Sequence, residues 1–321
     1  MLPRLPLGSL GRLRCLLLRA AYMALPSVAL ALSTLPSARA QQMEPRSYSN
    51  APVGLNFLLA GYAYQWGDVL VDPSLPIKNA NAKVNTALFG YSRVFDFWGE
   101  SGTLALVLPY ASVSANGEVE GQPASVVRSG FGDLGLRLSV NVYGAPALSL
   151  KEFRDYRQDT IVGVNFLMTA PTGRYDPTKL VNIGTNRWSF KPEVGVSKAL
   201  GQWTVEGALG VTFFTANDQF LGNNVRQQSP LYAAQAHLIY NFNPRLWGSM
   251  DATYFSGGRT SVNGDLNDDL QQNSRIGATL AQALDIHNSV KLFVASGATA
   301  RTGTDFRALA IAWQYRWGAG L

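Results

Sequence analysis

Side chains that commonly perform catalysis near neutral pH are scarce in this sequence of 321 residues, which contains two histidines and one cysteine. His287 lies in the polar stretch from Asp285 to Asn288, where we expect a solvated turn residue. His237 lies on the polar face of an alternating segment, where we expect a hydrogen bond to its neighbours. No local spacing of serine, histidine and carboxylate predicts a nucleophilic triad. The sequence therefore predicts no catalytic residues.

Acidic and amide side chains are concentrated in one stretch, where Asp265 is followed by Asn267, Asp268 and Asp269. This stretch lacks the ligand spacing of a calcium-binding loop, so we interpret it as a solvated loop. We therefore expect neither a metal ion nor any other cofactor.

The charged residues most able to act on a ligand lie in segments where apolar and polar residues alternate. Both signs of charge occur on the polar faces of these segments. They predict an internal network of ion pairs, which lets a narrow interior bury charge, or a permeation path whose selectivity they set, and both can hold together. The candidate pore-lining residues are Asp133, Arg137, Lys191, Glu193, Glu206, Asp251, Arg275, Lys291 and Arg316.

The clearest alternating segment lies near the end of the chain, from Leu309 to Trp317. Its odd-numbered residues are large and apolar or aromatic, and the residues between them are small or polar. A period of two indicates a β-strand with two unlike faces. A soluble sandwich would turn the large face inward, whereas a membrane barrel would turn it outward to lipid.

Similar segments recur along the chain. Together they predict about twelve strands, an even number that suits an up-and-down membrane barrel with both termini on one side. No segment outside the first forty residues has helical periodicity over two or more turns. The clear segments span 134–142, 188–197, 203–213, 232–242 and 309–317, and the weaker ones 53–66, 82–95, 103–114, 159–170, 245–256, 274–284 and 289–299.

The connections between these segments alternate in length, as they do in outer-membrane barrels with short periplasmic turns and long outer loops. One connection breaks the rule, because 144–157 is long on the short side, and we expect a small helical insertion at 148–156. The short connections are 96–102, 199–202, 241–244 and 285–289, and the long ones are 67–81, 115–130, 171–186, 215–230 and 256–273.

The composition of the polar faces distinguishes the sandwich from the barrel. These faces carry mostly Ser, Thr, Asn, Gly and Ala, whereas the solvent face of a sandwich would be rich in Lys and Glu. Aromatic residues gather near strand ends, as in the girdles at membrane interfaces. We therefore predict an all-β fold, an antiparallel up-and-down transmembrane β-barrel of about 12 strands over residues 53–317.

The first forty residues predict a secretory signal peptide that is cleaved after Ala40 and carries Cys15 away with it. They hold five of the 27 basic residues and none of the 21 acidic ones, so the mature chain has 22 against 21 and a net charge near +1. Nothing in this balance predicts a nucleic-acid partner. We expect residues 41–52 to be a periplasmic segment and residues 318–321 a short tail.

Three short stretches resemble one family of outer-membrane barrels, whose members are labelled as proteins of a MetA pathway of phenol degradation. They are Gly130–Asp133, Pro171–Tyr175 and Asn182–Trp188. The resemblance covers roughly residues 50–317 and implies a Gram-negative outer-membrane barrel with a transport function. The last strand also resembles the C-terminal strand that the barrel-assembly machinery reads, with Trp317 as the terminal aromatic residue.

Three functions agree with this sequence. The leading hypothesis is a channel or passive transporter in the bacterial outer membrane for small molecules, aromatic or otherwise hydrophobic ones among them. The second is a structural or interaction barrel with a plugged lumen and ligand-binding outer loops. The third is a lipid-modifying barrel enzyme. The partners expected are outer-membrane lipid, a small-molecule permeant and the assembly machinery.

Overall fold

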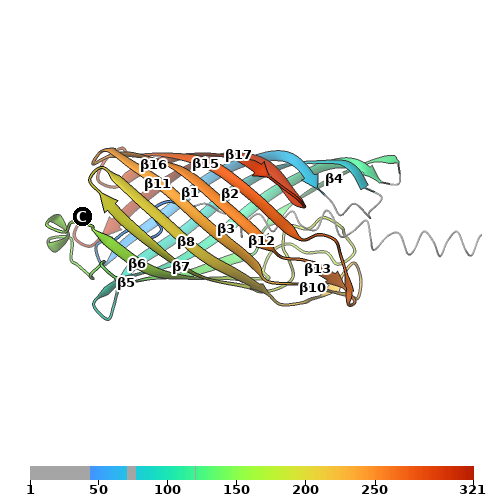
Figure 1. Ribbon diagram of the computed structural model, residues 1–321, viewed down its shortest axis with the longest axis horizontal. Helices are drawn as coiled ribbons and strands as arrows, with labels where there is room; N and C mark the ends of the chain where they lie inside the picture. Colours follow the sequence, from blue (N-terminus) through green and yellow to red (C-terminus); the bar gives the residue numbers. More distant parts are fainter. Residues whose placement is uncertain (1–43, 71–76, 120) are drawn as a thin grey trace, which may run out of the picture.

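The computed structural model describes residues 44–70, 77–119 and 121–321. The expected signal peptide, its cleavage after Ala40 and Cys15 lie outside these ranges. Most of the described chain is antiparallel β-strand, and one sheet of thirteen strands closes on itself into a barrel (Figure 1). Among the described residues, no helix is long and apolar enough to cross a membrane.

The barrel closes between its first and last strands. β1 (Leu55–Leu70) pairs along its whole length with β17 (Gly303–Gly318). β4 (Gln122–Phe131) and β5 (Leu134–Tyr143) follow one another beside the same neighbour, β3 (Glu100–Val119), so the thirteen strands fill twelve positions in the wall. The predicted antiparallel barrel of about 12 strands is confirmed.

The wall has up-and-down topology, because each strand is hydrogen-bonded to the wall strands before and after it. Backbone groups in the bilayer thereby find partners within the sheet, as a closed barrel requires. The other wall strands are β2 (Ile77–Phe97), β6 (Thr160–Ala170), β7 (Ser189–Leu200), β8 (Trp203–Phe214), β11 (Leu231–Asn243), β12 (Leu246–Gly257), β15 (Gln271–Ala283) and β16 (Asn288–Thr299).

The alternation in the sequence becomes the two faces of the wall. On β7, Val194 and Val196 are 48% and 44% exposed on the outer face, whereas Ser197 is fully buried on the inner face. On β17, Leu309 and Ile311 face outward in the same way. The exposed apolar residues meet lipid in a membrane, so the terminal strand has its large face outside.

The two ends of the barrel differ in their connections. One end carries the chain's C-terminus and tight turns such as Trp98–Gly99 and Gly201–Gln202, and we call it the short-turn end. It also carries the long connection 144–159, which contains one turn of 3₁₀ helix, Glu152–Arg154, within the helical insertion expected at 148–156. The opposite end is the long-loop end.

The long-loop end contains more regular structure than the sequence predicts. The expected loop 115–130 is a hairpin of β3 and β4 that extends the wall beyond its neighbours (Figure 1). Backbone hydrogen bonds within such a hairpin need no apolar face, so its alternation is weak. Two other loops form a separate four-stranded sheet, which consists of β9 (Asn217–Phe220), β10 (Asn224–Gln228), β13 (Thr260–Val262) and β14 (Asp265–Leu266).

Candidate functional site

Residues 44–50, which we call the N-terminal strap, lie inside the barrel near its short-turn end. The chain enters beside the wall, where the backbone N–H of Val53 donates to the carbonyl of Leu148 and that of Gly54 to the carbonyl of Val94, at 2.9 and 3.0 Å. The sequence predicts a periplasmic segment at 41–52, and the described part of it differs by being folded into the lumen. Its hydrogen bonds and ion pair with the wall strands are with residues of β5, β6, β7, β8 and β11, which follow one another in the sheet.

Tyr48 packs on the inner wall over two glycines. Gly163 on β6 and Gly195 on β7 lie opposite one another in the register, and both face inward. A Cβ atom at Gly195 would lie 2.2 Å from the Tyr48 ring, and one at Gly163 would lie 2.7 Å from it. The ring therefore packs directly on the backbone of two strands, and Tyr48 is only 3% exposed.

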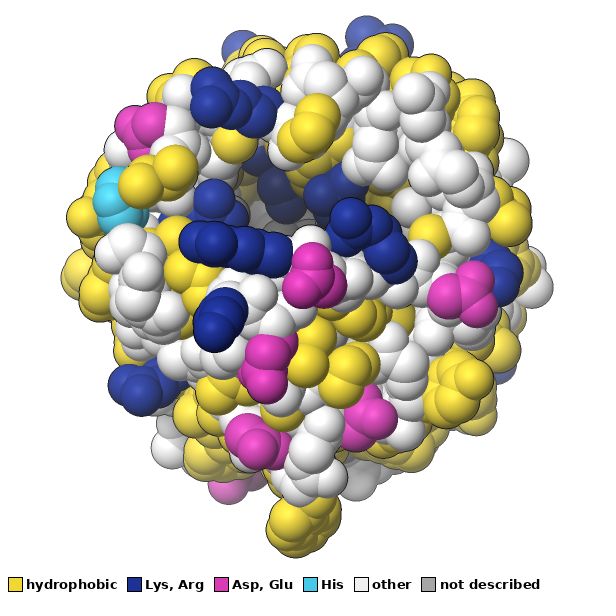
Figure 2. Space-filling model, turned by 90° about the vertical axis from the view of Figure 1, so that its left-hand side faces the viewer, with side chains coloured by type: hydrophobic (Ala, Val, Ile, Leu, Met, Phe, Trp, Pro, Cys, Tyr) yellow, Lys and Arg dark blue, Asp and Glu magenta, His cyan; other side chains and the backbone are white. Residues whose placement is uncertain are grey.

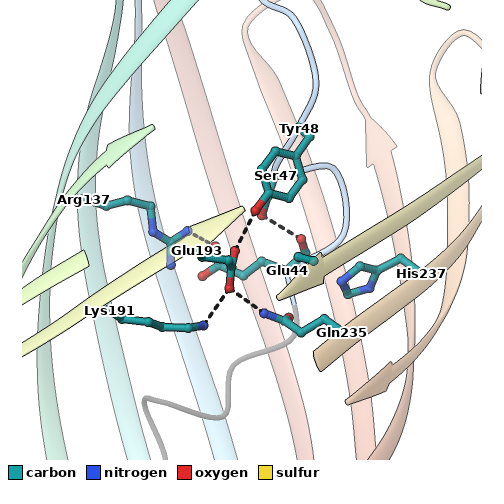
Figure 3. A pocket seen from close by; sticks show the side chains of 9 residues that line it. Glu44, Ser47, Tyr48, Arg137, Lys191, Glu193, Gln235 and His237 are labelled. Atoms are coloured by element: carbon teal, nitrogen blue, oxygen red, sulfur yellow. Dashed lines mark hydrogen bonds and ion pairs between the residues drawn. The ribbon is translucent and has the colours of Figure 1, made fainter. Parts of the chain in front are cut away.

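Polar groups of the wall hold the Tyr48 hydroxyl. It donates to Oε1 of Glu193 at 2.9 Å and accepts from Nδ2 of Asn165 at 3.1 Å. The other Glu193 oxygen accepts from Nζ of Lys191 at 2.8 Å and from Nε2 of Gln235 at 2.9 Å (Figure 3). Glu193 thus joins the strap to three strands of the wall.

Two further residues of the strap pair with charges on the wall. Glu44 forms an ion pair with Arg137 of β5. The backbone N–H of Arg46 donates to Oε2 of Glu206 at 2.8 Å, while its guanidinium bonds to the side chain of Asn241. The strap therefore satisfies one wall cation and one wall anion. A small polar cavity lies between strap and wall, with room for little more than a water molecule (Figure 3).

A second buried polar group lies on the wall beside the strap. Nδ1 of His237 is 2.7 Å from Oδ1 of Asp251, and the other Asp251 oxygen accepts from Ser249 and Thr279 at 3.1 and 3.0 Å. His237 is hydrogen-bonded to a neighbour, as expected of a lumen residue. Because Ser249 bonds to Asp251 and not to His237, these three side chains do not have the relay order of a hydrolase triad.

Six of the nine candidate pore-lining residues come together in the half of the lumen that holds the strap. Lys291 belongs to this group, because its Nζ lies 5.9 Å from the Trp247 ring that also stacks on Arg46, at 4.5 Å. The group contains both signs of charge: Lys191 pairs with Glu193 within it, and Arg137 pairs with Glu44 of the strap. Its members are Arg137, Lys191, Glu193, Glu206, Asp251 and Lys291.

The other three candidates lie elsewhere. Arg275 is buried on β15 toward the long-loop end. Arg316 lies at the rim of the short-turn end, where its Nε donates to the carbonyl of Ile286 at 2.6 Å. Asp133 differs most from the expected position on the wall, because it occupies the two-residue break between β4 and β5.

Asp133 fastens the long connection 171–188 to the barrel. Its carboxylate accepts from the backbone N–H groups of Gly173 and Thr185, both at 2.9 Å, and from the Thr185 hydroxyl at 2.7 Å. Gly173 and Gly184 pack so closely that a Cβ on Gly173 would lie 2.7 Å from the Cα of Gly184. The three stretches on which the family resemblance rests therefore meet at one structural latch.

Near the long-loop end, the inner wall is apolar on the side formed by β1, β2, β3 and β17, in contrast to the charged half. Buried side chains of β1, β2, β3 and β17 form one cluster with the tips of two long loops, 171–188 and 215–230. The wall contributes Val69, Ala82, Val84, Val113, Ala115 and Phe306, and the loops contribute Val181, Ile183 and Phe220. The loops thus fold inward over an apolar lining.

The short-turn end has a hollow bordered by Lys and Arg side chains (Figure 2). Acidic side chains lie mainly on one side of it. Among the residues described, no three His, Cys, Asp or Glu side chains come close enough together to hold a metal ion.

Sequence reasoning identified the charges of the wall but missed what they bind. It did not single out Glu44, Arg46 and Tyr48, or the glycine pair that seats Tyr48. An inward-facing glycine at 163 and another at 195 were visible in the alternation, but their pairing depends on the register of β6 and β7.

A search of curated proteins gives no match. Among solved structures, an outer membrane channel from Pseudomonas putida is 21% identical with a TM-score of 0.74, over 86% of this chain and 100% of that one. The transport unit of the autotransporter AIDA-I from Escherichia coli is 10% identical with a TM-score of 0.51, over 90% and 98%. The translocator domain of NalP from Neisseria meningitidis is 9% identical with a TM-score of 0.51, over 88% and 96%. These likenesses establish the outer-membrane barrel fold.

One family model matches residues 67–311, from the end of β1 to the middle of β17. The matched region contains the latch at Asp133 and the glycine pair beneath Tyr48. The resemblance that the three short stretches carry is therefore confirmed over most of the barrel. The chain belongs to the family described as "Putative MetA-pathway of phenol degradation".

Proposed function

We propose that the protein is a passive channel of the outer membrane for small molecules, and that the N-terminal strap closes it. The observation that carries this proposal is that the strap occupies the lumen and is held to the wall by one ion pair and a few hydrogen bonds, which water can replace. The wall charges Lys191 and Glu193 pair with each other, as do His237 and Asp251. Departure of the strap leaves these pairs intact and a polar path beside them.

The apolar lining near the long-loop end supports aromatic and other hydrophobic molecules as permeants. Val84, Val113 and Phe306 pack against the loop tips in the closed structure, and once the tips move an apolar solute gains by leaving water at this surface. The loop tips over the lining must move for such a solute to pass. The chemistry of this lining is thus our reason for proposing aromatic and other hydrophobic permeants.

Conductance of the mature protein in a planar bilayer tests the channel. We expect the intact chain to open rarely and a variant without residues 41–50 to conduct steadily. Both proteins must show heat-modifiable gel mobility, which reports a folded barrel. Folded protein that never conducts, with or without these residues, would contradict the proposal.

The inward loops favour a second candidate, a plugged barrel whose outer loops bind a ligand. The sheet of β9, β10, β13 and β14 and the cluster around Phe220 fill the long-loop end. This candidate predicts ligand binding without conductance, and without uptake of an aromatic solute into vesicles. Uptake that depends on the folded barrel would rule it out.

We further propose that signal peptidase cleaves after Ala40 and that both termini and the short turns are periplasmic. The alternation of connection lengths supports this orientation. Protease applied to whole cells is expected to cut 171–186 and 256–273 before the turn 199–202, and the reverse order would contradict the orientation. Recognition of the last strand by the assembly machinery predicts that Trp317→Ala lowers the amount of assembled barrel.

A further inference from the structure

Two arginines are buried together in the connections at the long-loop end. Arg187 lies near the end of the connection 171–188, with Trp188 between it and β7, and Arg226 lies in β10. Each side chain is 6% exposed. Such burial is unusual for arginine unless its charge is paired.

Each arginine stacks on an aromatic ring and leaves part of its guanidinium unused. Arg187 lies 4.5 Å above the ring of Phe214, and Arg226 lies 5.3 Å above the ring of Phe220. Nη2 of Arg187 bonds to the side chain of Gln228, but its Nη1 is buried without a hydrogen-bond partner in the described chain. Nε of Arg226 is likewise buried without one there.

Nearby carboxylates are engaged by other donors. Asp133 accepts from Gly173 and Thr185, as described above, and Asp269 accepts from the backbone N–H and hydroxyl of Thr260 at 2.8 and 2.6 Å. Within the ranges that the structure describes, neither Arg187 nor Arg226 forms an ion pair with an acidic side chain. Two positive charges therefore share an interior in which the acidic side chains near them, Asp133 and Asp269, act on the arginines without forming ion pairs.

The electrostatics of the pair favour an added anion. Burial and, second to it, the charge of Arg226 lower the pKa of Arg187 to about 9, against the opposing effects of Asp133 and Tyr175. Burial also lowers the pKa of Arg226. Burial raises the pKa of Tyr175, whose neutral hydroxyl donates to the carbonyl of Gln219 at 3.0 Å. A bound anion would relieve the repulsion and use the free N–H groups.

We propose that Arg187 and Arg226 form a binding site for the carboxylate of a small aromatic acid at the outer mouth of the barrel. The planar donor fork of arginine matches a carboxylate, and the rings of Phe214 and Phe220, whose faces the two guanidiniums cover, make the surroundings of the site apolar, as the body of such an acid requires. Phe220 also belongs to the apolar cluster of the lining, so the site adjoins the proposed path. This inference rests on the proposed channel and names one class of permeant.

Binding of benzoate to the purified full-length mature protein in detergent, measured by calorimetry, tests the site. We expect Arg187→Gln and Arg226→Gln each to weaken binding at least tenfold. Arg301→Gln is the matched control, because Arg301 is exposed in the same loop region and pairs with Asp268, and it should bind as the wild type does. Benzyl alcohol, which has the ring without the charge, should bind at least tenfold more weakly than benzoate.

Thermal unfolding shows whether a variant that fails to bind benzoate is still folded. Benzoate should raise the Tm of the wild type and leave that of Arg187→Gln unchanged. Equal binding of benzoate to the wild type and both arginine variants would overturn the proposal, as would tighter binding of inorganic phosphate than of benzoate. Because binding in detergent needs no conductance, failure of this site and failure of the channel are distinguishable.

Discussion

Gly195→Ala tests the seat of the strap by adding one methyl group to the wall. The new Cβ would lie 2.2 Å from Cε2 and 2.3 Å from Cζ of Tyr48. Carbon atoms pack at about 3.5–4.0 Å, so the ring must move by more than about 1 Å. Such a movement disrupts the hydrogen bonds of the Tyr48 hydroxyl to Glu193 and Asn165, because both partners are fixed on wall strands.

The cost of the added methyl falls on the closed state alone. Overpacking a filled site costs about 1–3 kcal/mol. β7 cannot yield, since it is hydrogen-bonded to β6 on one side and to β8 on the other. The strap can leave, and the methyl group then meets only solvent in the lumen. A penalty of this size lowers the ratio of closed to open channels by about 5–150-fold.

Open probability in single-channel recordings measures this change. Gly207→Ala is the matched control, because Gly207 is exposed on the outer face of β8 and the nearest atom to its new Cβ is 3.9 Å away. We expect the control to gate as the wild type does. In a Tyr48→Ala background, Gly195→Ala should add nothing. Equal open probabilities for Gly195→Ala and Gly207→Ala would refute the reasoning.

Leu138 tests the outer face: as a lipid-facing residue it should tolerate Ala with a modest loss, whereas Arg costs about 2–4 kcal/mol near the bilayer centre in reversible unfolding from vesicles. A loss of about 2–5 kcal/mol for Leu138→Ala, the value for a core leucine, would contradict its position. Arg137→Ala removes the partner of the strap carboxylate and should raise open probability and cation preference while gel mobility stays unchanged; unaltered selectivity would argue against a pore-lining role. Asp133→Asn weakens the three hydrogen bonds from Gly173 and Thr185, and bonds to a charged group contribute about 1.5–3 kcal/mol each, so trypsin should cut 171–188 several-fold faster. An unchanged cutting rate would contradict the role of Asp133 as the latch. Benzoate binding should persist below the pKa of Arg187, about 9, and be lost as pH rises through it, because only the protonated guanidinium attracts the anion; binding that persists at pH 11 would exclude Arg187 from the site.

The wall of the barrel was predictable because one local rule generates it. Alternation over 134–142 and 203–213 reports directly which side chains meet lipid, and each strand shows it without reference to any other. The structure of the long-loop end was harder to predict, because some of its strands are too short to show this alternation. β13 and β14 are three and two residues long, which is too short for a periodic pattern to be seen.

The charges of the lumen were predictable in identity but not in partnership. Lys191 and Glu193 stand two positions apart on one strand face, so their ion pair follows from strand geometry. Glu44 and Arg137 are 93 positions apart in the sequence, and their pairing depends on the folding of the strap into the lumen. The seat of Tyr48 depends similarly on the register that sets Gly163 opposite Gly195.

The most direct test of the strap as a gate is conductance while the strap is reversibly tied to the wall. Because the mature chain has no cysteine once Cys15 is removed, Glu44→Cys with Arg137→Cys gives two unique thiols across the ion pair. A short bis-methanethiosulfonate linker should silence this variant, and a reducing agent should restore conductance, while each single-cysteine variant stays unaffected by the cycle. Conductance that continues unchanged with the linker in place would contradict a gating role for the strap.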